Sequence, residues 1–150
     1  MSNNTDISKL DDLIVTTIDS VKGYDHSADH ANAARYAGMF RELATERRDV
    51  VLTLQTQSRA LGGTPSDFGS AAATLHRRFE DLRRALGGGD EVIVKEIDRG
   101  EDYLKEEYER ALRDTAISAE TRAIMDRCYA TVKRGHDEVS RLKHQFADAS

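Results

Sequence analysis

Hydrophobic residues recur every three or four positions along most of the chain, separated by charged and polar residues. This spacing places the hydrophobic side chains on one face of an α-helix, and no stretch alternates hydrophobic and polar residues as a strand would. We therefore expect an all-α protein. The first hydrophobic stripe opens near residues 6–8 and contains Leu10, Ile14, Thr17, Val21, Tyr24 and Ala28.

A second helix is predicted to begin near Asn32, which suits an N-cap position. Its stripe contains Tyr36, Phe40, Leu43, Val50, Leu54 and Leu61. The helix should end at "GGTP", where Gly62 or Gly63 suits the C-terminal cap and Pro65 suits the first turn of the next helix. That third helix has a stripe of Phe68, Ala71, Leu75, Phe79, Leu82 and Leu86 and stops at "GGGD".

Two more stripes complete the pattern, the last of them after a predicted cap at Ser118. They consist of Val94, Ile97, Leu104, Tyr108 and Leu112, and of Ile124, Cys128, Val132, Val139, Leu142 and Phe146. A short third helix between long ones can carry the chain back along a bundle, as the crossover of ferritin-like bundles does. Periodicity alone leaves simple up-and-down winding open. We expect one domain over residues 1–150, with an ordered core from about residue 7 to 146.

The charge and the composition limit the kinds of binding partner and the cellular compartment to expect. The chain has 22 basic and 27 acidic residues and a net charge of −5, so it offers no overall attraction to nucleic acid or to anionic lipid. No hydrophobic run approaches the roughly 20 residues that span a bilayer, and the polar start "MSNNTDISKLDDL" lacks the features of a signal peptide. The single Cys128 excludes an internal disulfide. We expect a cytoplasmic protein with no nucleic-acid or membrane partner.

Several motifs resemble those of a known family. They are "ALGGTPSDFGSAAATLHRRFEDLRRAL", "EIDRGEDYLKEEYERAL" and "VKRGHDEVSRL", and together they span the chain from about Ile7 to Phe146. The chain resembles a bacterial domain-of-unknown-function family of small rubrerythrin-like, ferritin-like four-helix bundles. The resemblance implies a ferritin-like fold with an additional helix in the crossover between the second and third bundle helices, and a cytoplasmic setting. The wider superfamily includes di-iron proteins.

The spacing of the candidate ligands along the sequence tests whether the chain can form a di-iron site. A ferritin-like di-iron site needs one Glu from each of two helices and a Glu-x-x-His pair from each of the other two. Glu101 lies in a hydrophobic stripe and His136 lies on the inner side of the last helix, but Lys133 precedes His136 by three residues and Asp49 follows Glu46 by three. Both pairs are therefore missing. The candidate ligands of a degenerate iron or manganese site are Glu101, His136, Glu46 and Asp25.

The other interpretation of Glu101 is structural. A buried carboxylate without a partner is costly, so a basic side chain should pair with it. Arg47 lies in the stripe of Leu43 and Val50 and should point into the same core, with Arg99 and His136 as alternative partners. This hypothesis predicts a core polar layer of Glu101, Arg47 and His136 that fixes helix register, and no cofactor.

Four other features are predicted to be structural. His26 and His30 have the spacing of a zinc or nickel clip, but the segment also suits a polar helix end. The glycine-rich turns lack the Lys-Ser/Thr of a phosphate-binding loop, and Cys128 lies on a hydrophobic helix face. A basic face interrupted by Glu80 and Asp81 should be solvated; it comprises His76, Arg77, Arg78, Arg83 and Arg84.

No catalytic triad or nucleophile–base pair can be assembled from the sequence. We favour a non-catalytic structural or interaction protein, with a homodimer and the identity of any protein partner left open. The alternative is an iron- or manganese-dependent oxidase or stress-response protein with a degenerate site. A bundle that binds a partner through an exposed apolar strip within residues 68–86 is a third hypothesis.

Overall fold

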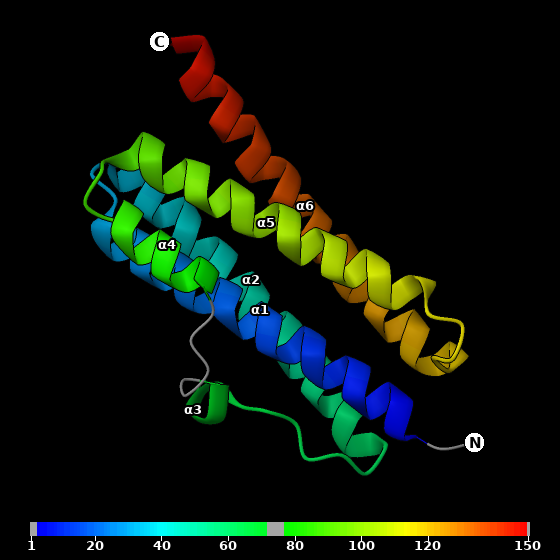
Figure 1. The fold of residues 1–150 in the computed structure, drawn as a ribbon. Helices are drawn as coiled ribbons and strands as arrows, with labels where there is room; N and C mark the ends of the chain where they lie inside the picture. Colours follow the sequence, from blue (N-terminus) through cyan, green and yellow to red (C-terminus); the bar gives the residue numbers. More distant parts are fainter. Residues whose placement is uncertain (1–2, 72–76, 150) are drawn as a thin grey trace.

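Four long helices and two short ones make up most of the described chain (Figure 1). The computed structural model describes residues 3–71 and 77–149, with side chains outside 70–80. The helices are α1 (Asn4–His30), α2 (Ala34–Ala60), α3 (Phe68–Ala71), α4 (Arg77–Ala85), α5 (Asp90–Arg113) and α6 (Ala119–Ala149). No residue in the described ranges is in a strand, so the predicted all-α class is confirmed there.

Contacts between helix ends define the directions of the four long helices. The side-chain amide of Asn3, before α1, donates to the carbonyl of Leu61, after α2, so these two helices are antiparallel. Asp90 at the start of α5 contacts the residues before α2, and Asp6 near the start of α1 contacts Ser118 before α6. Hence α2 and α5 run in one direction and α1 and α6 in the other (Figure 1). The segment from α2 to α5 must cross the length of the molecule.

The start of α2 is held by a residue that the sequence did not indicate. The Asp90 carboxylate accepts hydrogen bonds from the backbone N–H groups of Asn32 at 2.7 Å and Ala33 at 3.0 Å. The prediction that Asn32 caps the helix is wrong: α2 begins at Ala34, and the residue before it makes no side-chain cap. Asp90 instead satisfies two backbone donors and ties the start of α5 to the α1–α2 link.

A second carboxylate joins the starts of α1 and α6. Asp6 accepts hydrogen bonds from the backbone N–H of Ser118 at 3.0 Å and from its hydroxyl at 2.5 Å. The Ser118 hydroxyl in turn accepts from the N–H of Thr121, so the predicted cap is confirmed. Burial alone would raise the pKa of Asp6, but the hydrogen bonds from Ser118 and Thr121 outweigh it and lower that pKa below its ordinary value.

The end of α2 follows the glycine pattern expected from the sequence. Gly62 has a φ of 93° and donates to the carbonyl of Arg59, while Gly63 donates to the carbonyl of Ser58. These two bonds form a Schellman cap and confirm the predicted C-terminal signal. Pro65, however, lies in the irregular stretch between α2 and α3 and not in a helical turn.

Polar contacts hold the chain after Pro65 in a non-helical path. The Asp11 carboxylate accepts hydrogen bonds from the backbone N–H of Ser66 at 2.8 Å and from its hydroxyl at 2.9 Å. The side-chain amide of Gln55 donates to the carbonyl of Ser66. With its backbone groups bonded to α1 and α2, this segment does not need helical hydrogen bonds of its own.

Within the described residues, the predicted third helix corresponds to the segments α3 and α4. Residues 72–76, including Leu75 and His76, lie outside the described residues. The predictions for the side chains of Ala71, Arg77, Arg78, Phe79 and Glu80 also lie outside them. Leu82 of α4 is buried as expected, but Phe68 is 37% exposed, so its predicted core position is wrong. Arg84 pairs with Asp81 on the solvated side.

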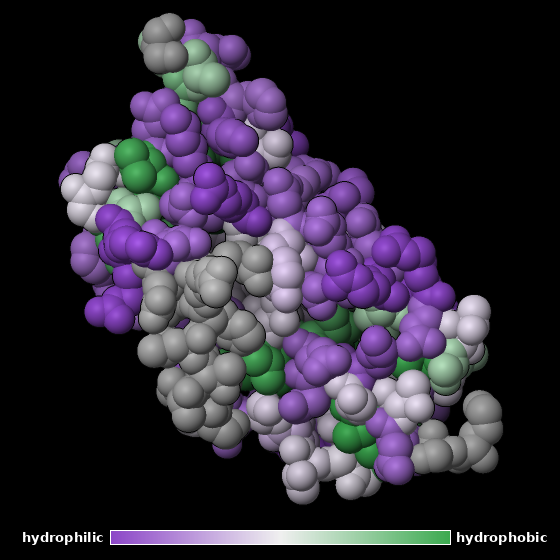
Figure 2. Space-filling model, viewed as in Figure 1, coloured by the Kyte–Doolittle hydropathy of each residue, from purple (hydrophilic) through white to green (hydrophobic). Residues whose placement is uncertain are grey.

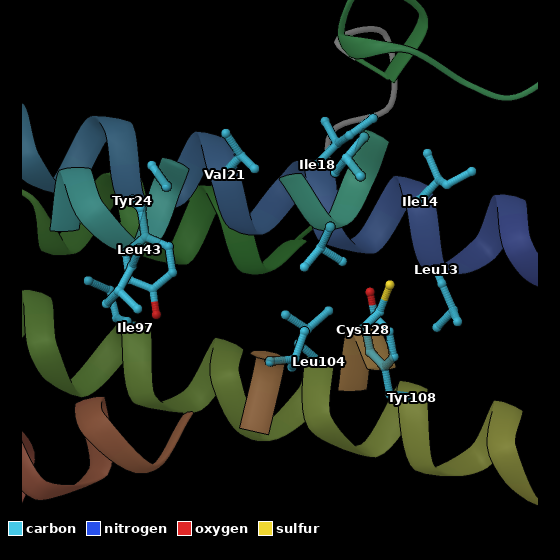
Figure 3. Packing of buried hydrophobic residues seen from close by; sticks show 14 of the residues in the cluster. Leu13, Ile14, Ile18, Val21, Tyr24, Leu43, Ile97, Leu104, Tyr108 and Cys128 are labelled. Atoms are coloured by element: carbon cyan, nitrogen blue, oxygen red, sulfur yellow. The ribbon is translucent and has the colours of Figure 1, made fainter. Parts of the chain in front are cut away.

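The core lies among the four long helices and follows most of the predicted stripes. In α6, however, Met125 is fully buried, and Ile124, which was predicted to be in the stripe, is only partly buried. Figure 3 shows Leu13 of α1 directed toward α5, and Leu104 and Tyr108 of α5 directed toward α1. Cys128 is buried as expected, and burial raises the pKa of its thiol to about 11. The face in Figure 2 is mostly hydrophilic, with hydrophobic residues in separate small areas. In the described part of the chain, every helix is too short or too polar to cross a membrane.

Candidate functional site

A fully buried arginine and a fully buried glutamate meet in the middle of the core. Arg47 of α2 is 0% exposed and Glu101 of α5 is 2% exposed. The two terminal nitrogens of Arg47 donate to the two carboxylate oxygens of Glu101, Nη1 to Oε2 at 3.0 Å and Nη2 to Oε1 at 2.6 Å. This two-point geometry is the strongest form of an arginine–carboxylate interaction. The structure thus brings together two of the three predicted members of the polar layer.

Neighbouring groups also accept hydrogen bonds from the two terminal nitrogens of Arg47. Nη1 of Arg47 also donates to the Ser20 hydroxyl at 2.6 Å, and Nη2 donates to the carbonyl of Val132 at 3.3 Å. The hydrogens of both terminal nitrogens therefore bond to acceptors on α1, α5 and α6. Burial would lower the pKa of Arg47, but the negative charge of Glu101 outweighs it and raises that pKa above its ordinary value.

Tyr24 completes the network from α1. Its hydroxyl donates to Oε1 of Glu101, and its ring lies under the Arg47 guanidinium with 5.5 Å between the guanidinium carbon and the ring centroid. Burial and the adjacent Glu101 charge raise the pKa of Tyr24 well above its ordinary value, so the phenol stays protonated and remains a donor. We call Ser20, Tyr24, Arg47 and Glu101 the core network.

Gly135 of α6 makes room for the core network, and the sequence reasoning missed it. A Cβ atom at this position would lie 2.7 Å from Nη2 of Arg47 and 3.1 Å from a methyl group of Leu43. Glycine inside a helix is usually destabilising, so an isolated one in "KRGHD" signals a close packing contact. Here the contact is a charged side chain from the opposite helix.

Replacing Gly135 with alanine should therefore destabilise the protein. The added methyl group forces Arg47 away from its position, and overpacking of this kind costs about 1–3 kcal/mol. The matched control is Gly100→Ala in α5, where a Cβ meets nothing within 4 Å. That change should stabilise the helix by about 0.5–1 kcal/mol. Urea denaturation measures both effects, and a gain in stability for both variants would contradict the packing role of Gly135.

His136, the third predicted member of the layer, lies at the edge of the α5–α6 contact. Its side chain is 15% exposed. Nε2 hydrogen-bonds to Asp102 of α5 at 2.7 Å, and Nδ1 hydrogen-bonds to Asp137 at 3.0 Å. Burial lowers the pKa of His136, but the hydrogen bonds to Asp137 and Asp102 outweigh it, so the pKa is raised above its ordinary value of 6.5.

The raised pKa makes the contribution of His136 to stability depend on pH. A raised folded-state pKa stabilises the fold below the ordinary pKa, and the contribution disappears as the pH rises through the folded-state value. The advantage of the natural protein over His136→Gln should be greater at about pH 5.5 than at about pH 9, by less than about 1 kcal/mol because the group is partly exposed.

Denaturation of both proteins at the two pH values measures this difference. His144→Gln on the same helix is the control, since the His144 ring hydrogen-bonds to the carbonyl of Ser140. An advantage that grows with pH, or an equal pH effect in both variants, would show that the two aspartates do not act on His136.

The other candidate metal ligands are separated and paired with arginines. Asp25 pairs with Arg48 on the α1–α2 surface, and Glu46 lies 3.3 Å from Arg134 on the α2–α6 surface. Within residues 3–71 and 77–149, no group of three or more His, Cys, Asp and Glu side chains is placed to hold a metal ion. The structure therefore does not bring Glu101, His136, Glu46 and Asp25 together.

Two further candidates also lie outside the core network. Arg99, an alternative partner for Glu101, is on the surface and pairs with Glu96 at 3.2 Å. Nδ1 of His30 hydrogen-bonds to the backbone carbonyl of His26 at 2.9 Å, which is a contact of a helix end. Neither adds a reactive group to the core network.

A small cleft between α1 and α5 adjoins the core network. It has a volume of about 80 Å³, and its walls include Gly23, Tyr24, Leu82, Gly100 and Glu101. Gly23 lies close to Leu82, since a Cβ there would be 3.1 Å from a methyl group of that residue. The cleft is therefore bounded by α4 as well as by the two long helices.

The described chain is thus all-helical, and its core network holds a buried ion pair between Arg47 and Glu101. Glu101 is fully engaged by Arg47 and Tyr24, so the arrangement can fix helix register, and its carboxylate is already hydrogen-bonded at both oxygens. The chain belongs to the family described as Domain of unknown function (DUF2383), whose model matches residues 5–114. The match covers α1 to α5, and hence the whole core network, but not Gly135 or His136. No curated protein matches the sequence.

Proposed function

We propose that this protein is a cytoplasmic, rubrerythrin-like four-helix bundle of bacterial type with the ferritin-like crossover, and that it serves as a non-catalytic structural or interaction protein. The parallel directions of α2 and α5, with α4 in the segment between them, support the ferritin-like topology. Fold alone does not define function, so the proposal depends on the chemistry of the core.

The observation that carries this proposal is the two-point pairing of Glu101 with Arg47. The guanidinium supplies, from within the chain, the positive charge that a metal ion would supply to a core carboxylate. A metal would have to displace Arg47 and leave its charge buried without a partner, which is strongly unfavourable. The pairing of Asp25 with Arg48 and of Glu46 with Arg134 supports the same conclusion.

Metal analysis tests the proposal. Plasma mass spectrometry of the purified protein, before and after anaerobic incubation with Fe(II), should give far less than one iron or manganese ion per chain. Glu120→Gln, which alters an exposed carboxylate outside the candidate ligands, is the control for adventitious binding. One or two tightly bound ions per chain that are lost in Glu101→Gln but kept in Glu120→Gln would replace this proposal with the metal-dependent oxidase.

A further inference from the structure

We draw no further inference here: the strongest candidate, the cleft between α1 and α5 beside Gly23, Gly100 and Glu101, carries nothing because nothing in the described residues shows what covers it.

Discussion

Replacing Arg47 with methionine is expected to lower the free energy of unfolding by about 3–5 kcal/mol, because it leaves the Glu101 carboxylate buried without its counter-charge. Methionine fills much of the volume of the arginine side chain, so the loss of stability would result from the unpaired charge of Glu101 and not from a large cavity. The change also frees the Ser20 hydroxyl and the Val132 carbonyl from their hydrogen bonds to the guanidinium. Since small domains are stable by only about 5–15 kcal/mol, the variant should unfold at a much lower urea concentration.

The next residue in the chain provides the control. Arg48 also pairs with a carboxylate, that of Asp25, but the Arg48 side chain is 47% exposed. Surface ion pairs contribute about 0–1 kcal/mol, so Arg48→Met should have a small effect. If the two neighbouring variants lost equal stability in urea denaturation, burial of the Arg47–Glu101 pair would not be the reason for its importance.

Replacing Phe40 with alanine is the second change with a large expected effect. Phe40 of α2 is fully buried, and its ring centroid lies 6.1 Å from that of Tyr24 on α1. Removing a buried phenyl ring costs about 3–5 kcal/mol through lost burial and the cavity that remains. The ring also supports Tyr24, so the core network should loosen in the same variant. Thermal unfolding followed by circular dichroism measures the loss.

Leu52→Ala on the same helix is the matched control. Leu52 is 58% exposed, so its truncation should change the free energy of unfolding by less than about 0.5 kcal/mol. Phe40→Leu should lose less than Phe40→Ala because most of the hydrophobic volume remains. A small effect of Phe40→Ala would mean that α1 and α2 do not share the core described above.

The sequence predicted the features that depend on periodicity. Stripes of hydrophobic residues define which helix face is buried, so the long helices could be found without a structure. The same register placed Arg47 and Glu101 on inward faces, and a buried carboxylate implies a partner. Periodicity did not indicate that His136 lies at the edge of the helix contact, because residues near the border of a stripe can face either way.

The features that the sequence missed depend on contacts between distant residues. Three aspartates accept hydrogen bonds from the backbone of segments far away in the sequence: Asp6, Asp11 and Asp90. A single aspartate in a sequence does not indicate which distant backbone group it will contact. Pro65 suits the first turn of a helix by its local sequence, but the contacts of Ser66 with α1 and α2 determine the path of the chain after Pro65. Gly135 was detectable only as an isolated glycine within a helix, and its reason lies in Arg47 on α2.

The most direct measurement is a double-mutant cycle on the core pair. Free energies of unfolding are measured for the natural protein, Arg47→Met, Glu101→Gln and the double variant, in which the glutamine still accepts a hydrogen bond from Tyr24. We expect the double variant to recover much of the loss of either single variant, with a coupling free energy of at least about 2 kcal/mol. A coupling free energy below about 0.5 kcal/mol would mean that the interaction of Glu101 with Arg47 contributes little to the stability of the fold.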